Sequence, residues 1–463
     1  MQVGGLSARG APVARIGGDD YEVFGTIPGE KVEVAIEIRG RTSRVALLGL
    51  REASASRVAP RCAHAAECGG CDWQHIRYDT QLQLKQASVQ SLLERALGTA
   101  VVVEPTLATT GPETDADGAP WGFRDKVHFV FGAAPSGALA MGHYRRGTRS
   151  VVPVTECPVH APRGNATAFA LRDILADLEI PAAAPDGGGV ARHVVVRVGH
   201  ATGERLATLV VTRRDDKRLR VVSKRLLAAA AAPDGLYLNV HDKPNAWLFG
   251  RDTVHLHGRT RLREDVGGVS FLVSPTAFFQ TNVSAAGTLV DIVTRVVREH
   301  GASRVLDLYA GAGLFALPLA RGGSEVVAVE ESGDAVDAGV ASRDFNRIDT
   351  RACRFVSARA EDVVAGRVRG VDARFSPDAI VVDPPREGCP ESVLKGVLES
   401  HRPRVLVYVS CNPLTLARDL ATLSKARLVG PAHAPYRLDT VRPLDMFPHT
   451  PHLEVVATLV RAG

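Results

Sequence analysis

The spacing of hydrophobic and polar residues changes along the chain, and each spacing predicts a different kind of structure. Near the N-terminus, short β-prone runs such as KVEVAIEI (31–38) and RVALLGL (44–50) alternate with Gly, Pro and Asp turns, a pattern typical of a small all-β barrel. From about 61 to 268 the pattern is mixed. The periodic stretch 78–97 predicts a helix, whereas later runs such as HVVVRV and GLYLNV alternate as strands do.

From about 273 onward, apolar strands alternate with helical segments. A helical pattern over 284–301 is followed by the runs RVLDLY, SEVVAVE, DAIVVD and RVLVYVS. This order predicts a parallel, doubly wound α/β sheet, which binds its ligands beyond the carboxyl ends of its strands. We therefore expect an OB-like β-barrel at 1–58, a mixed central domain at 59–268 and a Rossmann-like α/β domain at 269–463.

The composition is that of an ordinary globular protein, with 45% hydrophobic and 23% charged residues among 463. No run of roughly 18 apolar residues predicts a membrane span, and the start lacks the apolar core of a signal peptide, so we expect a cytoplasmic protein. The net charge of +5 permits nucleic acid as a partner without requiring it. Basic clusters at 39–44, 143–149 and 213–225 can neutralise phosphates, although a solvated surface is the commoner explanation for any one cluster.

Four of the seven cysteines have the spacing of metal ligands. Cys62, Cys68 and Cys71 are separated by five and then two residues, and Cys157 follows at a distance. A cytoplasmic chain has little use for a disulfide framework, and four thiolates are enough for a tetrahedral zinc ion or a 4Fe-4S cluster. The spacing alone is at least as favourable to zinc.

A glycine turn in DLYAGAG marks the first candidate ligand site. Gly311 and Gly313 follow an apolar strand and precede a helical run, so they can let the backbone approach a ligand closely. The next strand ends on Glu330, about 20 residues later, where an acid can bind a ribose hydroxyl. The third glycine of an NAD site is missing at 314–316, so S-adenosylmethionine fits better.

Two further strands end in candidate catalytic residues. One delivers Asp383 into PPREG, and the other delivers Cys411 into NP. A cysteine just beyond a buried strand is placed as a nucleophile on a rigid support. By spacing alone, however, a small buried thiol explains Cys411 slightly better.

Five strings together resemble the RNA uracil-C5 methyltransferase family, whose members make 5-methyluridine in ribosomal or transfer RNA. They are SPTAFFQTN, DLYAGAG, VVDPPREG, YVSCNPLTLARDL and DMFPHTPHLEVV, in the order of the family. The resemblance extends over nearly the whole chain. It implies a class I methyltransferase fold in the C-terminal domain and S-adenosylmethionine as the methyl donor.

The resemblance implies that Cys411 is the nucleophile and Glu454 the general base. Carbon 5 of uracil is too weak a nucleophile to attack a sulfonium methyl group. A thiolate that adds to carbon 6 turns the ring into an enolate with electron density at carbon 5, which then accepts the methyl group. A carboxylate must afterwards remove the proton from carbon 5 so that the thiol can leave.

The same matching implies roles for residues around the cofactor and the target base. The cofactor is expected to be held by Gln280, Tyr309, Gly311, Gly313, Glu330 and Asp383. Asp383 is also expected near the reacting base, and Phe278 can pack on the base or the cofactor. An aromatic residue at such a position is otherwise more often part of a core.

The string CAHAAECGGCDWQH resembles the iron-sulfur segment of the same family. The resemblance implies a 4Fe-4S cluster on Cys62, Cys68, Cys71 and Cys157. Polar methyl transfer needs no electron, so we expect the cluster to have a structural or RNA-positioning role. Its presence points to ribosomal RNA, and specifically to 23S ribosomal RNA, as the substrate.

The N-terminal segment 13–50 resembles the RNA-binding TRAM barrel of the family. This implies that the segment grips RNA while the target base is unstacked and turned into the active site. The segment WGFRDKVHF (121–129) resembles a region that reaches the substrate, which implies RNA contacts for Arg124 and Lys126. Ordinary strand charges are an equally good explanation. The expected partner is RNA, bound by a monomer.

Several alternatives remain open at this point. The same chemistry can act on transfer RNA, and related cofactor sites serve cytosine or protein acceptors. Amino methylation would not need Cys411. A non-catalytic iron-sulfur protein that binds RNA or senses redox state would leave Cys411 as core and ignore S-adenosylmethionine.

Overall fold

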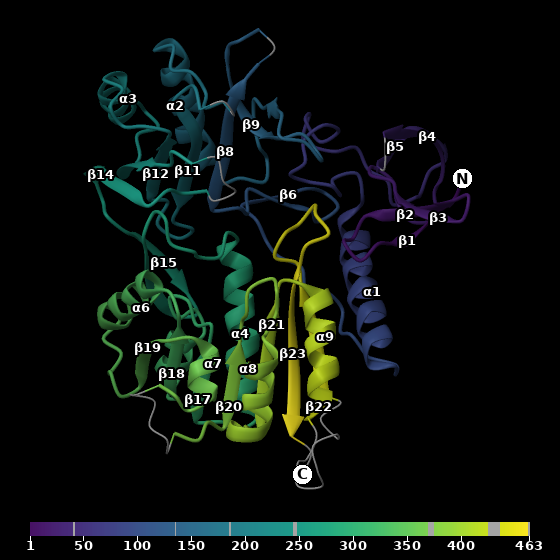
Figure 1. Cartoon of the computed structure of the whole chain (residues 1–463), viewed down its shortest axis with the longest axis vertical. Helices are drawn as coiled ribbons and strands as arrows, with labels where there is room; N and C mark the ends of the chain where they lie inside the picture. The colour runs from purple at the N-terminus through teal and green to yellow at the C-terminus, as the bar shows by residue number, and fades with distance from the viewer. Residues whose placement is uncertain are drawn as a thin grey trace.

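Two large sheets, one above the other in Figure 1, carry most of the chain. The structure is a computed structural model that describes residues 1–39, 42–134, 136–184, 187–243, 248–368, 375–424 and 436–461. Within these ranges, none of the helices combines the length and the apolar character that a membrane crossing requires.

The C-terminal sheet has seven strands, of which β23 runs antiparallel to its neighbours. Its order is β19 (Cys353–Ser357), β18 (Glu325–Glu330), β17 (Arg304–Leu308), β20 (Ala379–Val382), β21 (Val405–Ser410), β23 (Glu454–Arg461) and β22 (Tyr436–Leu444). The strands from β19 to β21 are parallel. The predicted doubly wound α/β sheet is therefore confirmed, but it is mixed and not parallel throughout, because β23 is antiparallel.

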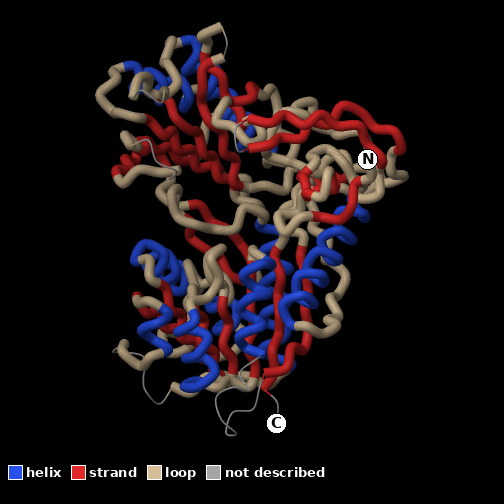
Figure 2. Tube along the Cα trace, turned by 45° about the vertical axis from the view of Figure 1, so that its right-hand side comes forward, coloured by secondary structure: helices blue, strands red, loops and turns tan. Residues whose placement is uncertain are grey.

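Helices cover both faces of this sheet (Figure 2). On one face lie α4 (Val283–Glu299), α5 (Ala316–Arg321) and α6 (Gly333–Phe345). On the other lie α1 (Tyr78–Leu97), α7 (Ala360–Val364), α8 (Glu391–Gly396), the π-helix η1 (Val397–His401) and α9 (Pro413–Ser424). Successive residues of a strand point to opposite faces, so Val405 packs into one core and Leu406 into the other. Burial on both sides explains why these strands read as continuous apolar runs.

Helix α1 has the bounds that its periodicity predicts, but its packing partner was not expected. It belongs to the segment 59–268 that we assign to a central domain, yet Val89, Leu92 and Leu93 pack into the same core as Leu420 of α9. Long side chains of one helix can fill a groove on a sheet far away in sequence. The three domain boundaries themselves remain a prediction.

The second large sheet carries the mixed pattern of the middle of the chain. Its order is β10 (Val151–Pro153), β9 (Leu139–Tyr144), β8 (Lys126–Ala133), β11 (Ala191–Val198), β12 (Arg205–Val211), β13 (Gly235–Val240) and β14 (Asp252–Gly258). Helices α2 (Pro162–Asp177) and α3 (Arg218–Leu227) pack on it. Two short hairpins complete this region: β6 (Glu113–Thr114) with β7 (Pro120–Trp121), and β15 (Leu262–Val266) with β16 (Val269–Val273).

The N-terminal region is all-β, as its pattern predicts. Strands β1 (Val3–Leu6), β2 (Pro12–Ile16) and β3 (Asp19–Glu22) form one sheet, and β4 (Lys31–Arg39) pairs with β5 (Thr42–Glu52). A bridge between Gln2 and Lys31 connects the two parts. Closure into an OB-like barrel remains a prediction. The basic cluster at 39–44 includes residues 40 and 41, which lie outside the described residues.

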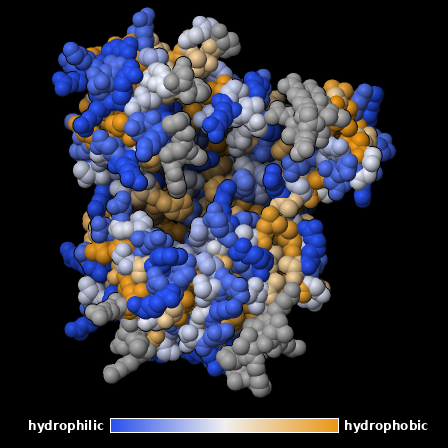
Figure 3. All heavy atoms as spheres, in the orientation of Figure 1, coloured by the Kyte–Doolittle hydropathy of each residue, from blue (hydrophilic) through white to orange (hydrophobic). Residues whose placement is uncertain are grey.

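The orientation of the C-terminal sheet determines where a site can form. In Figure 1 the antiparallel strand β23 points away from the upper sheet, so the parallel strands end at the edge that faces the upper sheet. Loops after β17, β20 and β21 therefore lie between the two sheets. Figure 3 shows that this face of the molecule is hollowed at the same level.

The packing of α1 leads to a stability prediction. Leu93 is fully buried against the C-terminal sheet. We expect Leu93→Ala to lower the free energy of unfolding by about 2–5 kcal/mol, because truncation leaves a cavity. The exposed neighbour Arg95 provides the control, since Arg95→Ala should change stability by less than about 0.5 kcal/mol. Urea unfolding measures both, and equal values for the two variants would contradict the packing.

Candidate active site

The glycine turn after β17 has a backbone that few side chains could adopt. Gly311 and Gly313 have φ angles of 54° and 88°, and a Cβ atom at Gly313 would lie 2.7 Å from the ring of Phe355. Tyr309, just before the glycines, has a φ of 61°. A non-glycine residue in this region costs about 1–3 kcal/mol, and such strain concentrates at ligand sites.

Glu330 lies at this turn, as its spacing from the glycines predicts. Its two carboxylate oxygens accept hydrogen bonds from the backbone N–H of Gly311, at 2.9 Å, and of Ser332, at 2.8 Å. These bonds fix the end of β18 to the loop after β17. The carboxylate is thereby oriented at the sheet edge where a ligand ribose would lie.

Asp307 is a buried acid at this turn that we did not single out from the sequence. Its side chain is inaccessible. Burial raises the pKa of Asp307 well above its ordinary value, and the nearby charge of Asp383 raises it further. Burial and the neighbouring charge therefore both favour its neutral form. The signal was a charged residue inside the apolar run RVLDLY.

Hydrogen bonds join the loops that follow β20 and β21. The side-chain amide of Asn412 donates to the backbone oxygen of Arg386 at 2.8 Å, and the hydroxyl of Thr415 donates to the same oxygen at 3.2 Å. Asp383 begins the first loop and Cys411 the second. The structure therefore brings these two predicted site residues to one edge.

Asp419 braces the loop after β20 from the protein interior. Its buried Oδ2 accepts hydrogen bonds from the hydroxyl of Tyr408, at 2.6 Å, and from the backbone N–H of Cys389, at 2.8 Å. Gly388, with a φ of 78°, leaves room for this contact, since a Cβ atom there would lie 2.6 Å from Asp419. The loop that carries Asp383 and Arg386 is thus held on a rigid support.

Strand register places Glu454 opposite Cys411. Strands β21 and β23 are antiparallel and pair Ser410 with Val455, so one step further along both strands brings Cys411 and Glu454 together. The charge of Glu454 accordingly raises the pKa of the Cys411 thiol. This pairing joins residues that are far apart in the sequence.

Burial is the first reason why the pKa of the Cys411 thiol rises to about 11. The charges of Glu454 and Asp383 raise it as well, whereas Arg386, which also hydrogen-bonds the thiol, lowers it. Near pH 7 only roughly one thiol in ten thousand is ionised at such a pKa. Arg386 was also not singled out from the sequence, although it stands in the string PPREG.

Asp383 and Glu454 form a coupled pair of carboxyl groups. Burial raises the pKa of Asp383 to about 7. Burial and the charge of Asp383 raise the pKa of Glu454 well above its ordinary value, and Arg386 lowers it. Two carboxylates this close resist simultaneous ionisation, so the pair holds at least one proton near neutral pH.

The segment that contains Phe278 and Gln280 is held by the central sheet. Arg197 of β11 donates hydrogen bonds to the backbone oxygens of Pro275 and Ala277. Phe278 is 76% exposed, so it is not part of a core. Gln280 is half-buried. It lies two residues before Asn282, the N-cap of α4.

The two predicted RNA contacts lie near enough for the charge of Arg124 to act on Lys126, but their other neighbours differ. Lys126 is the register partner of Arg197, and its ammonium lies 5.8 Å from the ring centre of Phe249. Burial lowers the pKa of Lys126 to about 7, and the charges of Arg197 and Arg124 contribute. Arg124 is directed instead towards Cys71 and Cys157, whose thiols raise its pKa against the larger effect of burial.

The four predicted metal ligands converge at the central sheet. Cys157 lies in its core and Cys71 packs against that core. Burial raises the pKa of each of the four thiols, and the charges of the other cysteines add to this for Cys62, Cys71 and Cys157. The group is thus separate from Cys411 at the C-terminal sheet.

A second group of possible metal ligands is more closely spaced than the four cysteines. Cys157 is the only residue that belongs to both groups. His143, Cys157 and His160 have ligand atoms within 4.8 Å of one another. In the described part of the chain, the four cysteines do not form such a group. A zinc ion with four thiolates needs sulfur atoms roughly 3.8 Å apart, given Zn–S bonds of about 2.3 Å. A cluster spaces its thiolates more widely, because each binds a different iron.

The described sulfur atoms are therefore not at the spacing of a four-thiolate zinc. Arg124 lies near them: its buried Nε has no hydrogen-bond partner among the described residues, and the charges of Cys157 and Cys71 raise its pKa. A cation so placed can offset the negative charge of four thiolates.

The C-terminal sheet, the glycine turn after β17 and the polar residues at the strand ends are together those of a class I methyltransferase. Comparisons with known proteins place the chain more narrowly, since the family described as tRNA (Uracil-5-)-methyltransferase matches residues 261–462. An uncharacterized RNA methyltransferase of Thermosynechococcus vestitus is 34% identical over 99% of this chain and 97% of its own length. Another, from Halalkalibacterium halodurans, is 30% identical over 95% of this chain and 91% of its own.

A solved structure agrees over the whole chain. The tRNA (uracil-54, C5)-methyltransferase of Pyrococcus abyssi, in complex with S-adenosyl-L-homocysteine, matches with a TM-score of 0.76 and 27% identity. The match covers 99% of this chain and 98% of the Pyrococcus protein. The chain therefore belongs to the tRNA (uracil-5-)-methyltransferase family of RNA methyltransferases. This membership favours an enzyme over the non-catalytic alternative.

The electrostatics of Cys411 predict its reactivity. Because the thiol pKa is about 11, the rate of alkylation of Cys411 by iodoacetamide should rise about tenfold per pH unit between pH 7 and 10. Arg386 lowers that pKa, so Arg386→Met should raise it and slow alkylation at a given pH. Mass spectrometry of the Cys411 peptide measures the rate, and Arg437→Met, at an exposed arginine of β22, is the control. Unchanged rates in Arg386→Met would contradict the contact.

Proposed function

We propose that this protein methylates carbon 5 of a uridine in RNA, with Cys411 as a covalent nucleophile and Glu454 as the general base. The observation that carries the proposal is the β21–β23 register, which sets Cys411 opposite Glu454 beside the loop of Asp383. Uracil chemistry needs both a nucleophile and a base, and the family in which the chain falls acts on uracil.

S-adenosylmethionine is the proposed cofactor. The relative from Pyrococcus abyssi was solved with its demethylated product, S-adenosyl-L-homocysteine. In this chain the residues that would hold it are Gln280, Tyr309, Gly311, Gly313, Glu330 and Asp383. The positive φ angles of the turn and the fixed carboxylate of Glu330 suit a ligand with a ribose. When bound, the cofactor supplies an electrophilic methyl group.

Cys411 starts the reaction by forming a bond to carbon 6 of the uracil. The electron pair of the 5,6 double bond moves towards the carbonyl oxygen at carbon 4, and carbon 5 becomes nucleophilic. The high thiol pKa means that the proton must leave Cys411 during the attack rather than before it. The acceptor is whichever of Asp383 and Glu454 is ionised, because both charges act on the thiol. That proton must pass on to water before Glu454 can accept the proton from carbon 5.

Glu454 ends the reaction by accepting the proton from methylated carbon 5. The C–H electron pair then re-forms the double bond, and the bond between carbon 6 and the sulfur breaks. Burial raises the basicity of Glu454, which favours proton transfer from carbon. Arg386 lowers the pKa of Glu454, so its charge keeps an ionised form accessible.

The proposed substrate is 23S ribosomal RNA, and transfer RNA is the second candidate. The first rests on the cysteine segment and its resemblance to the ribosomal type. The second rests on the relative from Pyrococcus abyssi, which is a tRNA (uracil-54, C5)-methyltransferase. We assign Phe278 and Lys126 to RNA contact, because an exposed aromatic ring can stack on a base. The N-terminal strands are the proposed TRAM region, and the protein is proposed to act as a monomer.

A 4Fe-4S cluster on Cys62, Cys68, Cys71 and Cys157 is the proposed metal group. The convergence of the thiols and the position of Arg124 support it. Its proposed role is structural, because methyl transfer by this route moves electron pairs and needs no redox partner.

Removing either catalytic residue should block a different step. Cys411→Ala should abolish 5-methyluridine formation while S-adenosylmethionine still binds, because the cofactor residues remain. Glu454→Gln should accumulate a methylated covalent RNA adduct, with product release slowed roughly 10²- to 10⁴-fold. Labelled cofactor with unmodified transcripts of 23S ribosomal RNA and of transfer RNA measures both steps and identifies the RNA.

Cys353→Ala is the matched control, since Cys353 is a buried cysteine of the edge strand β19. Its activity should match that of the unaltered enzyme. Full activity of Cys411→Ala would exclude the covalent mechanism, and normal product release by Glu454→Gln would move the base elsewhere. If neither RNA acquires 5-methyluridine from the unaltered enzyme, the proposed activity is wrong.

Metal analysis distinguishes the cluster from a mononuclear site. Protein prepared without oxygen should be brown and hold about four iron atoms per chain. Cys62→Ser and Cys68→Ser should lose iron, whereas His143→Ala should keep it. Zinc that disappears in His143→Ala and persists in Cys62→Ser would instead assign the metal to His143, Cys157 and His160.

A further inference from the structure

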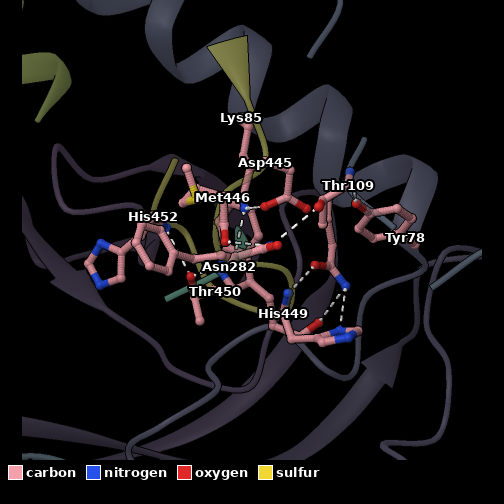
Figure 4. Close-up of polar contacts among 12 residues, drawn as sticks. Tyr78, Lys85, Thr109, Asn282, Asp445, Met446, His449, Thr450 and His452 are labelled. Atoms are coloured by element: carbon pink, nitrogen blue, oxygen red, sulfur yellow. Dashed lines mark hydrogen bonds and ion pairs between the residues drawn. The ribbon is translucent and has the colours of Figure 1, made fainter. Parts of the chain in front are cut away.

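A buried ion pair lies beside the loop that leads to Glu454. The ammonium of Lys85, on α1, donates to Asp445, which directly follows β22, and both side chains are fully inaccessible. The two residues are 360 positions apart. Figure 4 shows the pair at the centre of a network of polar contacts.

The loop at 445–453 determines the position of Glu454. It connects β22 to β23, and its ends are joined, because Leu444 pairs with Glu454 in the antiparallel register. Any shift of the loop therefore shifts the first residue of β23. The loop itself has no helix or strand to hold its shape.

Side chains from two distant helices fix the first turn of this loop. Lys85 also donates to the backbone oxygen of Phe447 at 3.1 Å. Asn282, the N-cap of α4, donates to the backbone oxygen of Met446 at 3.1 Å and accepts from Ala285 at 3.1 Å. Figure 4 shows Lys85 and Asn282 on the same part of the loop.

The middle of the loop is held as firmly at His449, which has a φ of 65°. Its N–H donates to the side-chain oxygen of Gln81 at 2.9 Å, and its carbonyl accepts from the N–H of Trp73 at 2.9 Å. Its ring stacks on Trp121 with centroids 4.0 Å apart. The left-handed backbone is strained for histidine, so these contacts must hold it in place.

The ion pair is an expensive way to obtain stability alone. Desolvating two charges costs several kcal/mol per ion, and apolar residues of similar size often stabilise a fold as well or better. What an ion pair adds is a defined geometry between Lys85 and Asp445. Since Lys85 reaches two points of the loop, that geometry is passed to the backbone that precedes Glu454.

We propose that Lys85 and Asp445 are positioning residues for Glu454. They set the 445–453 loop so that the carboxylate meets carbon 5 of the covalent adduct, and Asn282 ties the same loop to the cofactor segment two residues after Gln280. This inference rests on the proposed role of Glu454. It concerns the elimination step and not the binding of the cofactor.

The double variant Lys85→Met/Asp445→Asn tests the proposal, because it removes both charges and leaves neither one unpaired. It should still transfer the methyl group but accumulate the methylated covalent adduct, with elimination slowed roughly 10- to 100-fold by misplacement of the base. Labelled S-adenosylmethionine and the same two RNA transcripts give the ratio of adduct to free 5-methyluridine. A purely structural role would lower thermal stability without changing that ratio.

Two further variants keep the test decisive. Gln81→Met removes the hydrogen bond to His449 without a charge change and should raise the same ratio, and it decides the matter if the double variant does not fold. Val89→Ala, on α1 one turn beyond Lys85, removes buried packing away from the loop and should lower stability alone.

The outcomes separate this inference from the proposed function. If the unaltered enzyme forms 5-methyluridine and Glu454→Gln traps the adduct, but the double variant and Gln81→Met release product as Val89→Ala does, the positioning role is wrong. If the unaltered enzyme forms no 5-methyluridine and Glu454→Gln traps nothing, the proposed function itself has failed.

Discussion

Burial of the central parallel strands on both faces is the constraint on which the rest of the site depends. β17, β20 and β21 present apolar side chains to two separate cores, so the polar side chains of this segment can reach a ligand only where a strand ends. Tyr309, Asp383 and Cys411 each stand at such an end. Asp307, within β17, is the exception, and its burial favours the neutral form.

The antiparallel strand β23 brings the amino end of a strand to this edge of the sheet, which the parallel strands cannot do. Parallel strands all deliver their carboxyl ends to the edge, whereas β23 delivers its amino end, and with it Glu454. Glu454 and Cys411 therefore approach the same space from opposite chain directions. The charges of Glu454 and Asp383 add to the larger effect of burial, and all of these raise the pKa of the Cys411 thiol.

Local patterns in the sequence predict the features that depend on neighbouring residues, such as the helices and strands. The period of 78–97 identifies α1 with its correct bounds, and the apolar runs identify β17, β18, β20 and β21. The five strings of the family identify Cys411 and Glu454 as candidates, and the strand register then supplies their contact. No local pattern shows that the apolar face of α1 packs on the C-terminal sheet, because periodicity reveals a buried face but not its partner.

Contacts between charged residues that are far apart in the sequence cannot be predicted for the same reason. Lys85 reads as an ordinary lysine of an amphipathic helix, and nothing near it in the sequence reveals Asp445. Arg386 stands in a recognised string, but only the fold shows that it faces both Cys411 and Glu454. The closure of the N-terminal strands into a barrel depends on long-range pairing and is likewise beyond local patterns.

The pairing of Lys85 with Asp445 also orders events during synthesis. A ribosome makes α1 early, but the partner of its buried lysine is added among the last residues of the chain. Until then Lys85 lacks the partner that it has in the folded protein, and the apolar face of α1 lacks the C-terminal core into which it packs. A nascent or truncated chain thus carries Cys411 without an aligned Glu454. The contacts that hold the 445–453 loop form only when α1 has met the C-terminal segment.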